Sequence, residues 1–175
     1  MKKIVLVFIV LITGTICVFA EEELEEFKEY GNNCAVFNTV DIFTDEVSHI
    51  FSCRQSEFLD ETIIEFFVNG SNGQFIVAIS TGFQSRFDEE VEIAIRVDKN
   101  QLRTGVWSYY SEHDFAISLN DLTLFNDLLL EIARGNRLAI RVGDKSGTIS
   151  LKGSANAITD FTKRIAHLNI FNGVQ

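Results

Sequence analysis

Proline is absent from the 175 residues, and methionine and tryptophan each occur only once. Without proline, chain reversals have to come from Gly, Asn, Asp and Ser. Apolar bulk is supplied by 16 phenylalanines, which predicts a core packed largely by aromatic rings. Basic residues are scarce, with 15 Lys and Arg against 25 Asp and Glu. That balance disfavours nucleic acid and anionic lipid as partners, because both bind basic surfaces.

Recognised catalytic motifs are also missing. The sequence contains no Gly-x-Ser-x-Gly, no phosphate-binding loop, no dinucleotide fingerprint and no His-Glu-x-x-His. The three histidines, His49, His113 and His167, stand in no triad pattern. We therefore expect a non-enzymatic protein without a cofactor. A hydrolase or metal-dependent enzyme, whose site would form only in three dimensions, remains the alternative.

The best metal candidate is the group Asp41, Asp45, Glu46 and His49. Oxygen and imidazole ligands in a tight turn could hold a cation. However, His49 alternates with apolar residues and so shares a strand face with them, which favours a hydrogen-bonded histidine near the core. We interpret the acidic residues as the turn itself and predict no metal. A second cluster, at residues 112–114, is interpreted as a polar hairpin tip.

The N-terminus has the layout of a secretory signal peptide. Lys2 and Lys3 precede an apolar stretch at residues 4–20, and Val18-Phe19-Ala20 is followed at once by Glu21. We predict cleavage after Ala20 and export to the periplasm or the exterior. A retained membrane anchor is the alternative, but the stretch is at the lower limit of a bilayer span. After cleavage we expect no stable membrane insertion.

Residues 21–33 form an acidic leader. Most of its charge comes from six glutamates, opposed only by Lys28: Glu21, Glu22, Glu23, Glu25, Glu26 and Glu29. We interpret it as a solvated, partly helical segment. A tail that binds a basic partner is the alternative reading.

Two cysteines remain when the signal peptide, with Cys17, is removed. Cys34 and Cys53 have no Cys-x-x-Cys spacing and so make a poor zinc or redox site. In an oxidising compartment these cysteines can pair. The bond would close a loop of about 20 residues and add about 3 kcal/mol to the unfolding free energy. We predict a structural Cys34–Cys53 disulfide.

Residues 34–175 carry the pattern of one mostly β domain of the α+β class. Alternating or bounded apolar runs predict strands at residues 36–43, 47–53, 62–68, 75–81, 91–98, 102–108, 115–119, 138–142 and 148–151. Helical spacing follows Asn120 or Asp121, with Gly135 as its end, and again follows Ser154. We expect an antiparallel β-sandwich of about eight or nine strands with two helices, one late and one C-terminal.

Three aromatic residues crowd one strand end. Trp107, Tyr109 and Tyr110 follow Gly105, and a turn must come before Phe115. Trp and Tyr are the residue types that anchor protein interfaces. We take these three as the candidate interface with another protein. The alternative is that Trp107 fills the core and the tyrosines cover it.

The C-terminal half resembles small exported bacterial β-sandwich proteins over about residues 88–168. The resemblance lies in Val91-Glu92-Ile93-Ala94-Ile95-Arg96-Val97-Asp98, Trp107 and Phe115-Ala116-Ile117, then in Leu138-Ala139-Ile140-Arg141-Val142 and Ile149-Ser150-Leu151-Lys152-Gly153-Ser154. It is similar to the periplasmic type VI secretion-associated family and, less closely, to the invasion-associated locus B family. The resemblance implies an envelope location and a non-enzymatic accessory role.

Taken together, these features predict an exported binding protein. It would serve as an envelope or secretion-system accessory factor or as a secreted effector. An inhibitor of a foreign enzyme is a variant of the same reading, since an acidic exported domain suits a basic target.

Overall fold

The computed structural model describes residues 22–41, 44–57, 60–81, 90–110 and 115–168. The predicted signal peptide and the cluster at residues 112–114 lie outside these residues. Ten strands are described: β1 (Glu22–Tyr30), β2 (Cys34–Asp41), β3 (Val47–Glu57), β4 (Asp60–Asn69), β5 (Phe75–Thr81), β6 (Glu90–Val97), β7 (Arg103–Tyr110), β8 (Phe115–Leu119), β9 (Arg137–Val142) and β10 (Lys145–Ser150). Two helices accompany them, α1 (Leu122–Arg134) and α2 (Ser154–Ile165), and the short η1 (Ala166–Leu168) follows α2.

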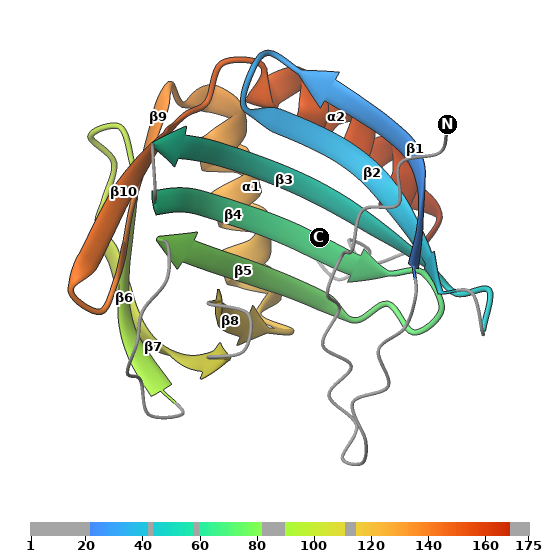
Figure 1. Ribbon diagram of the computed structural model, residues 1–175, viewed down its shortest axis with the longest axis horizontal. Coiled ribbons are helices and arrows are strands. Elements are labelled where there is room, and N and C mark those ends of the chain that lie inside the picture. The colour runs from blue at the N-terminus through green and yellow to red at the C-terminus, as the bar shows by residue number, and fades with distance from the viewer. Residues whose placement is uncertain (1–21, 42–43, 58–59, 82–89, 111–114, 169–175) are drawn as a thin grey trace.

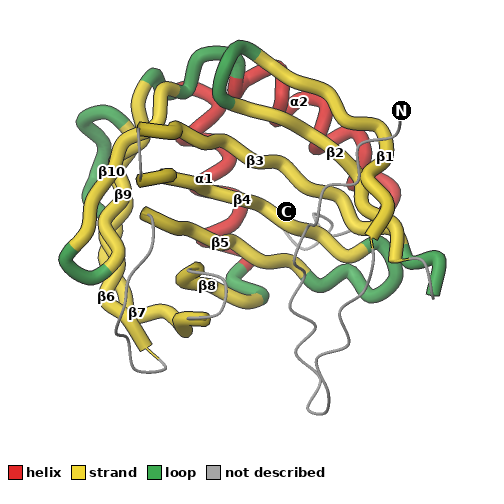
Figure 2. The backbone as a smooth tube through the Cα atoms, viewed as in Figure 1, coloured by secondary structure: helices red, strands yellow, loops and turns green. Residues whose placement is uncertain are grey.

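The strands form one antiparallel sheet in the order β1-β2-β3-β4-β5-β8-β7-β6-β9-β10. This confirms the mostly β, α+β class, with one helix late in the chain and one near its C-terminus. The strands are hydrogen-bonded into a single open sheet of ten, where we expected a sandwich of eight or nine. The sheet curves around the helices, which lie behind it in Figure 1 and are drawn red in Figure 2. We call the helix-packed side the inner face and the opposite side the outer face.

The curvature brings β10 close to β3 and β4, although these strands are far apart in the sheet order. Gly147 of β10 lies against Thr62 of β4, and a Cβ atom at Gly147 would collide with the Thr62 side chain. The close approach therefore requires glycine at this position.

The acidic leader is a strand, which corrects the expected partly helical segment. β1 pairs along β2, with a shift in register between Glu25 and Lys28. Phe27 packs against Phe37, with ring centroids 5.9 Å apart, and the Tyr30 hydroxyl reaches Asp160 on α2. These contacts on both sides of β1 stabilise it as a strand, although its local sequence is acidic.

Phenylalanine rings join the inner face to both helices. Phe51 on β3 and Phe66 on β4 lie 5.6 Å apart between ring centroids, and all their surface is buried. The Phe66 ring packs against Phe125 of α1, with 5.2 Å between ring centroids, and the Phe51 ring packs against Phe161 of α2, with 6.1 Å between centroids. Each such ring buries a large apolar area. The prediction of an aromatic core is therefore confirmed at this layer.

The helix ends agree only partly with the sequence-based expectation. Asp121 caps α1, because its Oδ1 accepts a hydrogen bond from the Leu124 backbone N–H at 2.9 Å, and Gly135 ends the helix. At α2, Ser154 is the first helical residue and does not act as the cap. Gly153 takes the cap position with φ 97°, and the Ser154 hydroxyl instead donates to the Ile132 carbonyl at 2.8 Å. Among the described residues, no helix is both long and apolar enough to cross a membrane.

Cys34 and Cys53 form the predicted disulfide. They are directly opposite one another on β2 and β3, with Cα atoms 4.1 Å apart, and both side chains are buried. The bond closes a loop that contains the β2–β3 hairpin. It therefore restricts the unfolded chain and fastens two strands that carry the inner-face core.

The disulfide yields a stability prediction. The double variant Cys34→Ala/Cys53→Ala should lose about 3 kcal/mol of unfolding free energy, because the unfolded chain regains the loop entropy. Denaturant unfolding measures this loss. A reductant should lower the stability of the unmodified protein by a similar amount and leave the double variant unaffected. A double variant as stable as the unmodified protein would contradict the assigned role of the bond.

Candidate functional site

The turn between β2 and β3 is held together by its own acidic residue. Asp41 Oδ1 accepts a hydrogen bond from the Thr44 backbone N–H at 3.1 Å, and the Asp41 carbonyl accepts one from the Asp45 N–H at 2.8 Å. His49 is engaged elsewhere, with Asn38. The described residues contain no group of three or more His, Cys, Asp or Glu side chains that could hold a metal ion. The turn reading of these acidic residues therefore agrees with the geometry.

His49 belongs to a polar cluster on the inner face. Its Nδ1 lies 2.9 Å from Asn38 Oδ1, and Asn38 Nδ2 donates to Glu26 Oε2 at 2.9 Å. Arg164 also donates to Asn38 Oδ1, at 3.2 Å. Since this amide oxygen accepts both bonds, His49 Nδ1 carries the proton and Nε2 is the unprotonated nitrogen of the neutral ring.

Arg164 connects α2 to β1 at the same place. Its guanidinium lies 3.4 Å from Glu26 Oε2 and 3.2 Å from Asp160 Oδ2, and it also donates to the Glu26 carbonyl. Asp160 Oδ2 accepts a further hydrogen bond from the Tyr30 hydroxyl at 2.7 Å. Partial burial alone would raise the pKa of Asp160, but the hydrogen bonds from Tyr30 and Arg164 lower it. We call Glu26, Asn38, His49, Asp160 and Arg164 the polar clamp, because together they fasten β1 and α2 to the sheet.

The polar clamp sets the protonation of His49. Burial lowers the pKa of His49 from 6.5, and the neighbouring His167 and Arg164 lower it further, against a weaker opposing effect of Glu26. The His167 ring stands edge-on, with its centroid 5.8 Å from that of His49. A neutral, hydrogen-bonded His49 therefore has a structural role.

This environment makes stability depend on pH. Because the folded pKa lies below 6.5, the unfolded chain binds the proton more readily, and the unfolding free energy should fall as pH drops from about 6.5 toward the folded pKa. Denaturant unfolding across this range measures the slope. His49→Gln should remove this part of the slope, whereas His167→Gln should only reduce it. A slope unchanged in His49→Gln would contradict the assignment.

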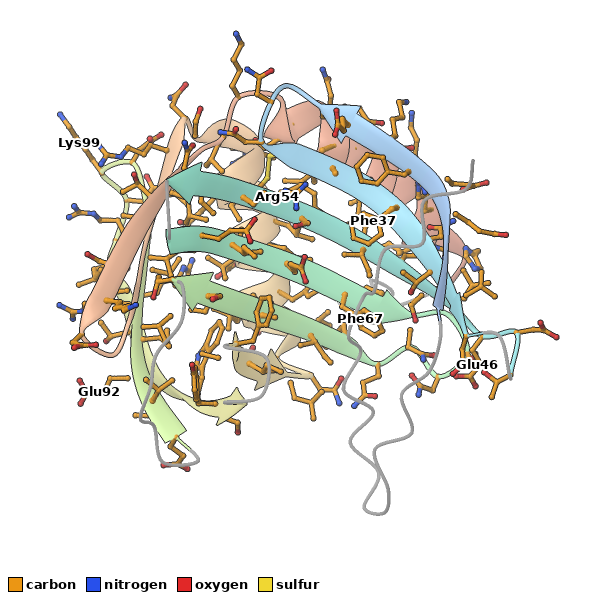
Figure 3. All side chains as sticks on the ribbon, viewed as in Figure 1. Phe37, Glu46, Arg54, Phe67, Glu92 and Lys99 are labelled. Atoms are coloured by element: carbon orange, nitrogen blue, oxygen red, sulfur yellow. A yellow bond between two sulfur atoms is a disulfide. The ribbon has the colours of Figure 1, made fainter. Side chains whose placement is uncertain are left out.

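The outer face carries an unusual apolar row across β2, β3, β4, β5 and β8. Register places its members opposite one another in the order Phe37, Ile50, Phe67, Ile76 and Leu119. Figure 3 shows Phe37 and Phe67 on the side of the sheet away from the helices. The sheet is thus apolar on both faces here, in contrast to a typical antiparallel sheet with one solvated side.

Glu65 lies in the next row of this outer face, between Ser52 and Ala78. Burial raises the pKa of Glu65 above 4.5, although a hydrogen bond from Ser52 and the charge of Arg54 oppose the shift. A carboxylate in apolar surroundings loses hydration that these partners do not fully replace. Ionised Glu65 is therefore a local cost to folding.

Glu65→Gln should accordingly increase the unfolding free energy at pH 7, because the amide fills the same space without a charge. The gain should vanish below about pH 4.5, where the native glutamate is protonated and equally well tolerated. Thermal or denaturant unfolding at both pH values tests this. Glu92→Gln, the same change at an exposed position of β6, is the control and should give no gain. A Glu65→Gln variant less stable at pH 7 would show that the carboxylate is needed.

Two of the three residues taken as the candidate interface have described side chains, and both are buried. Trp107 is 8% exposed and Tyr109 is 7% exposed, and both belong to the inner-face core. Register pairs Trp107 with Val91 and Tyr109 with Ala116, which also face inward. The side chain of Tyr110 lies outside the described part. The alternative interpretation, that Trp107 fills the core, thus agrees with the geometry, and Tyr109 shares that burial.

The other side of the same strand is open. Val106 on β7 is 60% exposed and Leu102, just before β7, is 51% exposed. Both lie on the outer face, because β7 alternates and its inward positions carry Trp107 and Tyr109. Thr104 stands between them on this face, and exposed large aliphatic residues of this kind are candidates for contact with a partner.

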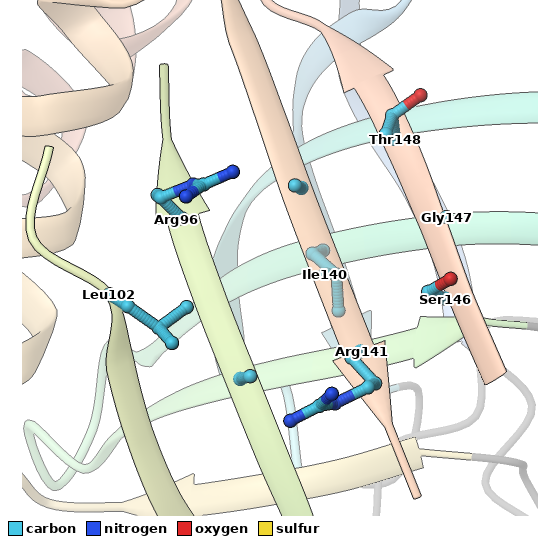
Figure 4. Close-up of a pocket in the computed structure, with 9 residues that line it drawn as sticks. Arg96, Leu102, Ile140, Arg141, Ser146, Gly147 and Thr148 are labelled. Atoms are coloured by element: carbon cyan, nitrogen blue, oxygen red, sulfur yellow. The ribbon is translucent and has the colours of Figure 1, made fainter. Parts of the chain in front are cut away.

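A shallow groove lies beside them. It has a volume of about 550 Å³ and is lined by Ala94, Arg96, Leu102, Ala139, Ile140, Arg141, Ser146, Gly147 and Thr148. Ala94 pairs with Arg141, and Arg96 pairs with Ala139, so alanines alternate with arginines across β6 and β9. In Figure 4, Arg96 extends from β6 toward β9 and Arg141 extends from β9 toward β6. Small side chains thus form a floor beneath two guanidinium groups.

Sequence reasoning identified the outward positions of residues 91–98 but not this groove. The alternation of β6 showed that Ala94 and Arg96 share a face. They lie next to Arg141 only because β6 pairs with β9, and the local sequence pattern does not predict that pairing.

Comparisons with known proteins leave the family open. Neither the family models, nor the curated proteins, nor the solved structures that were searched give a match to this chain.

Proposed function

We propose that the chain is an exported, non-enzymatic binding protein that holds a protein partner on the outer face of β6, β7 and β9. The contact surface, which we call the outer patch, consists of Arg96, Leu102, Val106 and Arg141. The observation that carries the proposal is the exposure of Leu102 and Val106 on a strand whose aromatic side is buried. Leu102 lines a groove together with Arg96 and Arg141, whereas Val106 lies opposite Glu92. Exposed apolar side chains mark contact sites, and arginine is enriched at protein interfaces.

Export is supported by the signal-peptide pattern of residues 1–20 and by the disulfide, a bond characteristic of oxidising compartments. The destination would be the periplasm or the exterior. The resemblance of residues 88–168 to secretion-associated envelope proteins is consistent with the same role and places the outer patch within the resembling region.

Binding is favoured over catalysis because the described side chains that could react are already bonded to other residues. His49 is buried in the polar clamp, Cys34 and Cys53 are joined to each other, and Asp160 is bonded to Tyr30 and Arg164. A general acid or base needs to reach a substrate from a pocket. The described groove contains arginines and hydroxyl groups instead.

Affinity capture from envelope and secreted fractions tests the proposal. The double variant Leu102→Ser/Val106→Thr removes the two exposed anchors while keeping a β-branched residue in β7. A partner captured by the unmodified protein should bind this variant at least about tenfold more weakly, because truncating an interface anchor removes much of the binding energy. Quantitative mass spectrometry and a binding titration with the captured partner provide the readout.

Leu130→Ser is the matched control, because Leu130 is 53% exposed on α1. It should retain capture, and all variants should melt near the temperature of the unmodified protein. Undiminished capture by the double variant, or equal loss in Leu130→Ser, would refute the outer patch as the binding surface.

A further inference from the structure

Two arginines of the groove have no anionic partner in the described part of a chain that is rich in carboxylates. Among the described residues, the side chains of Arg96 and Arg141 form no hydrogen bond or ion pair, although the chain has 25 Asp and Glu. Arg103 and Arg164, by contrast, each contact two carboxylates. Glu92, which precedes Ala94 on the outer face of β6, pairs with neither groove arginine.

Register makes Arg96 and Arg141 neighbours on one face of the sheet. Arg96 and Arg141 are diagonal neighbours across β6 and β9, a relation that leaves about 7–8 Å between backbone positions. Both side chains carry a positive charge, and an anion held by both would offset their mutual repulsion. Figure 4 shows that each of the two side chains reaches toward the other's strand.

The rest of the lining specifies what such an anion would carry. Ser146 and Thr148 supply hydroxyl donors on the β10 side, and Leu102 with the alanine floor supplies apolar contact. A volume of about 550 Å³ falls in the range of small-molecule sites. Guanidinium groups bind carboxylates through paired, charge-assisted hydrogen bonds.

We propose that this groove binds a small dicarboxylate with a short aliphatic spacer. Arg96 and Arg141 each hold one carboxylate, the hydroxyls of Ser146 and Thr148 donate to the remaining oxygens, and the spacer lies over Ala94 and Ala139. The groove shares Arg96, Leu102 and Arg141 with the outer patch, but this proposal does not rest on the protein-binding role, because ligand binding is tested on the purified protein alone.

Calorimetric titration of the purified protein with succinate, glutarate, acetate and inorganic phosphate tests the proposal. Succinate or glutarate should bind at least about tenfold more tightly than acetate, because only a dianion engages both arginines. Phosphate should bind more weakly than the better dicarboxylate, since it has no spacer to cover the apolar floor. Phosphate as the tightest ligand, or dicarboxylates no tighter than acetate, would overturn the assignment.

Arg96→Gln and Arg141→Gln should each weaken dicarboxylate binding about tenfold. Arg137→Gln is the matched control, because Arg137 is an exposed outward residue of β9 outside the groove lining. It changes the net charge equally and should leave the affinity unchanged. Equal weakening in all three variants would indicate a general charge effect and would refute a site at the groove. The melting temperature of each variant in the absence of ligand confirms that the fold is retained.

Discussion

The structure depends on the packing of phenylalanine rings between the inner face of the sheet and the two helices. Phe51 and Phe66 supply the sheet side, and Phe125 and Phe161 supply the helix side. These rings are wholly buried, so removing one would leave a large cavity. Because both helices are held on this side, the sheet curves around them, and the polar clamp and the disulfide fasten β1, β2 and β3 to the same core.

Packing of β7 against the inner core also determines which side chains β6, β7 and β9 expose. In a strand, neighbouring residues point to opposite faces, so burial of Trp107 and Tyr109 directs Val106 outward. The same alternation turns Arg96 and Arg141 away from the helices. The same alternation of side chains along the strands therefore buries the aromatic rings on the inner face and exposes the outer patch.

Local pattern was sufficient for much of the fold. Helical spacing and the Asp121 cap located α1, and the two cysteines that follow the predicted signal peptide indicated the disulfide. Interactions between distant segments were not visible in the same way. β1 is a strand because it pairs with β2, and the groove forms because β6 pairs with β9. Trp107 and Tyr109 were recognised as significant, but residue type alone did not decide which face they occupy.

Hydroxyl-radical footprinting read by mass spectrometry tests the orientation of β7 most directly. Tryptophan and tyrosine react intrinsically faster than leucine and valine, so protection of the two aromatic residues is a demanding result. The orientation described here predicts that Trp107 and Tyr109 are protected in the native protein and become labelled on unfolding, while Leu102 and Val106 are labelled in both states. Native labelling of Trp107 and Tyr109 at the unfolded rate, with Leu102 and Val106 protected, would contradict it.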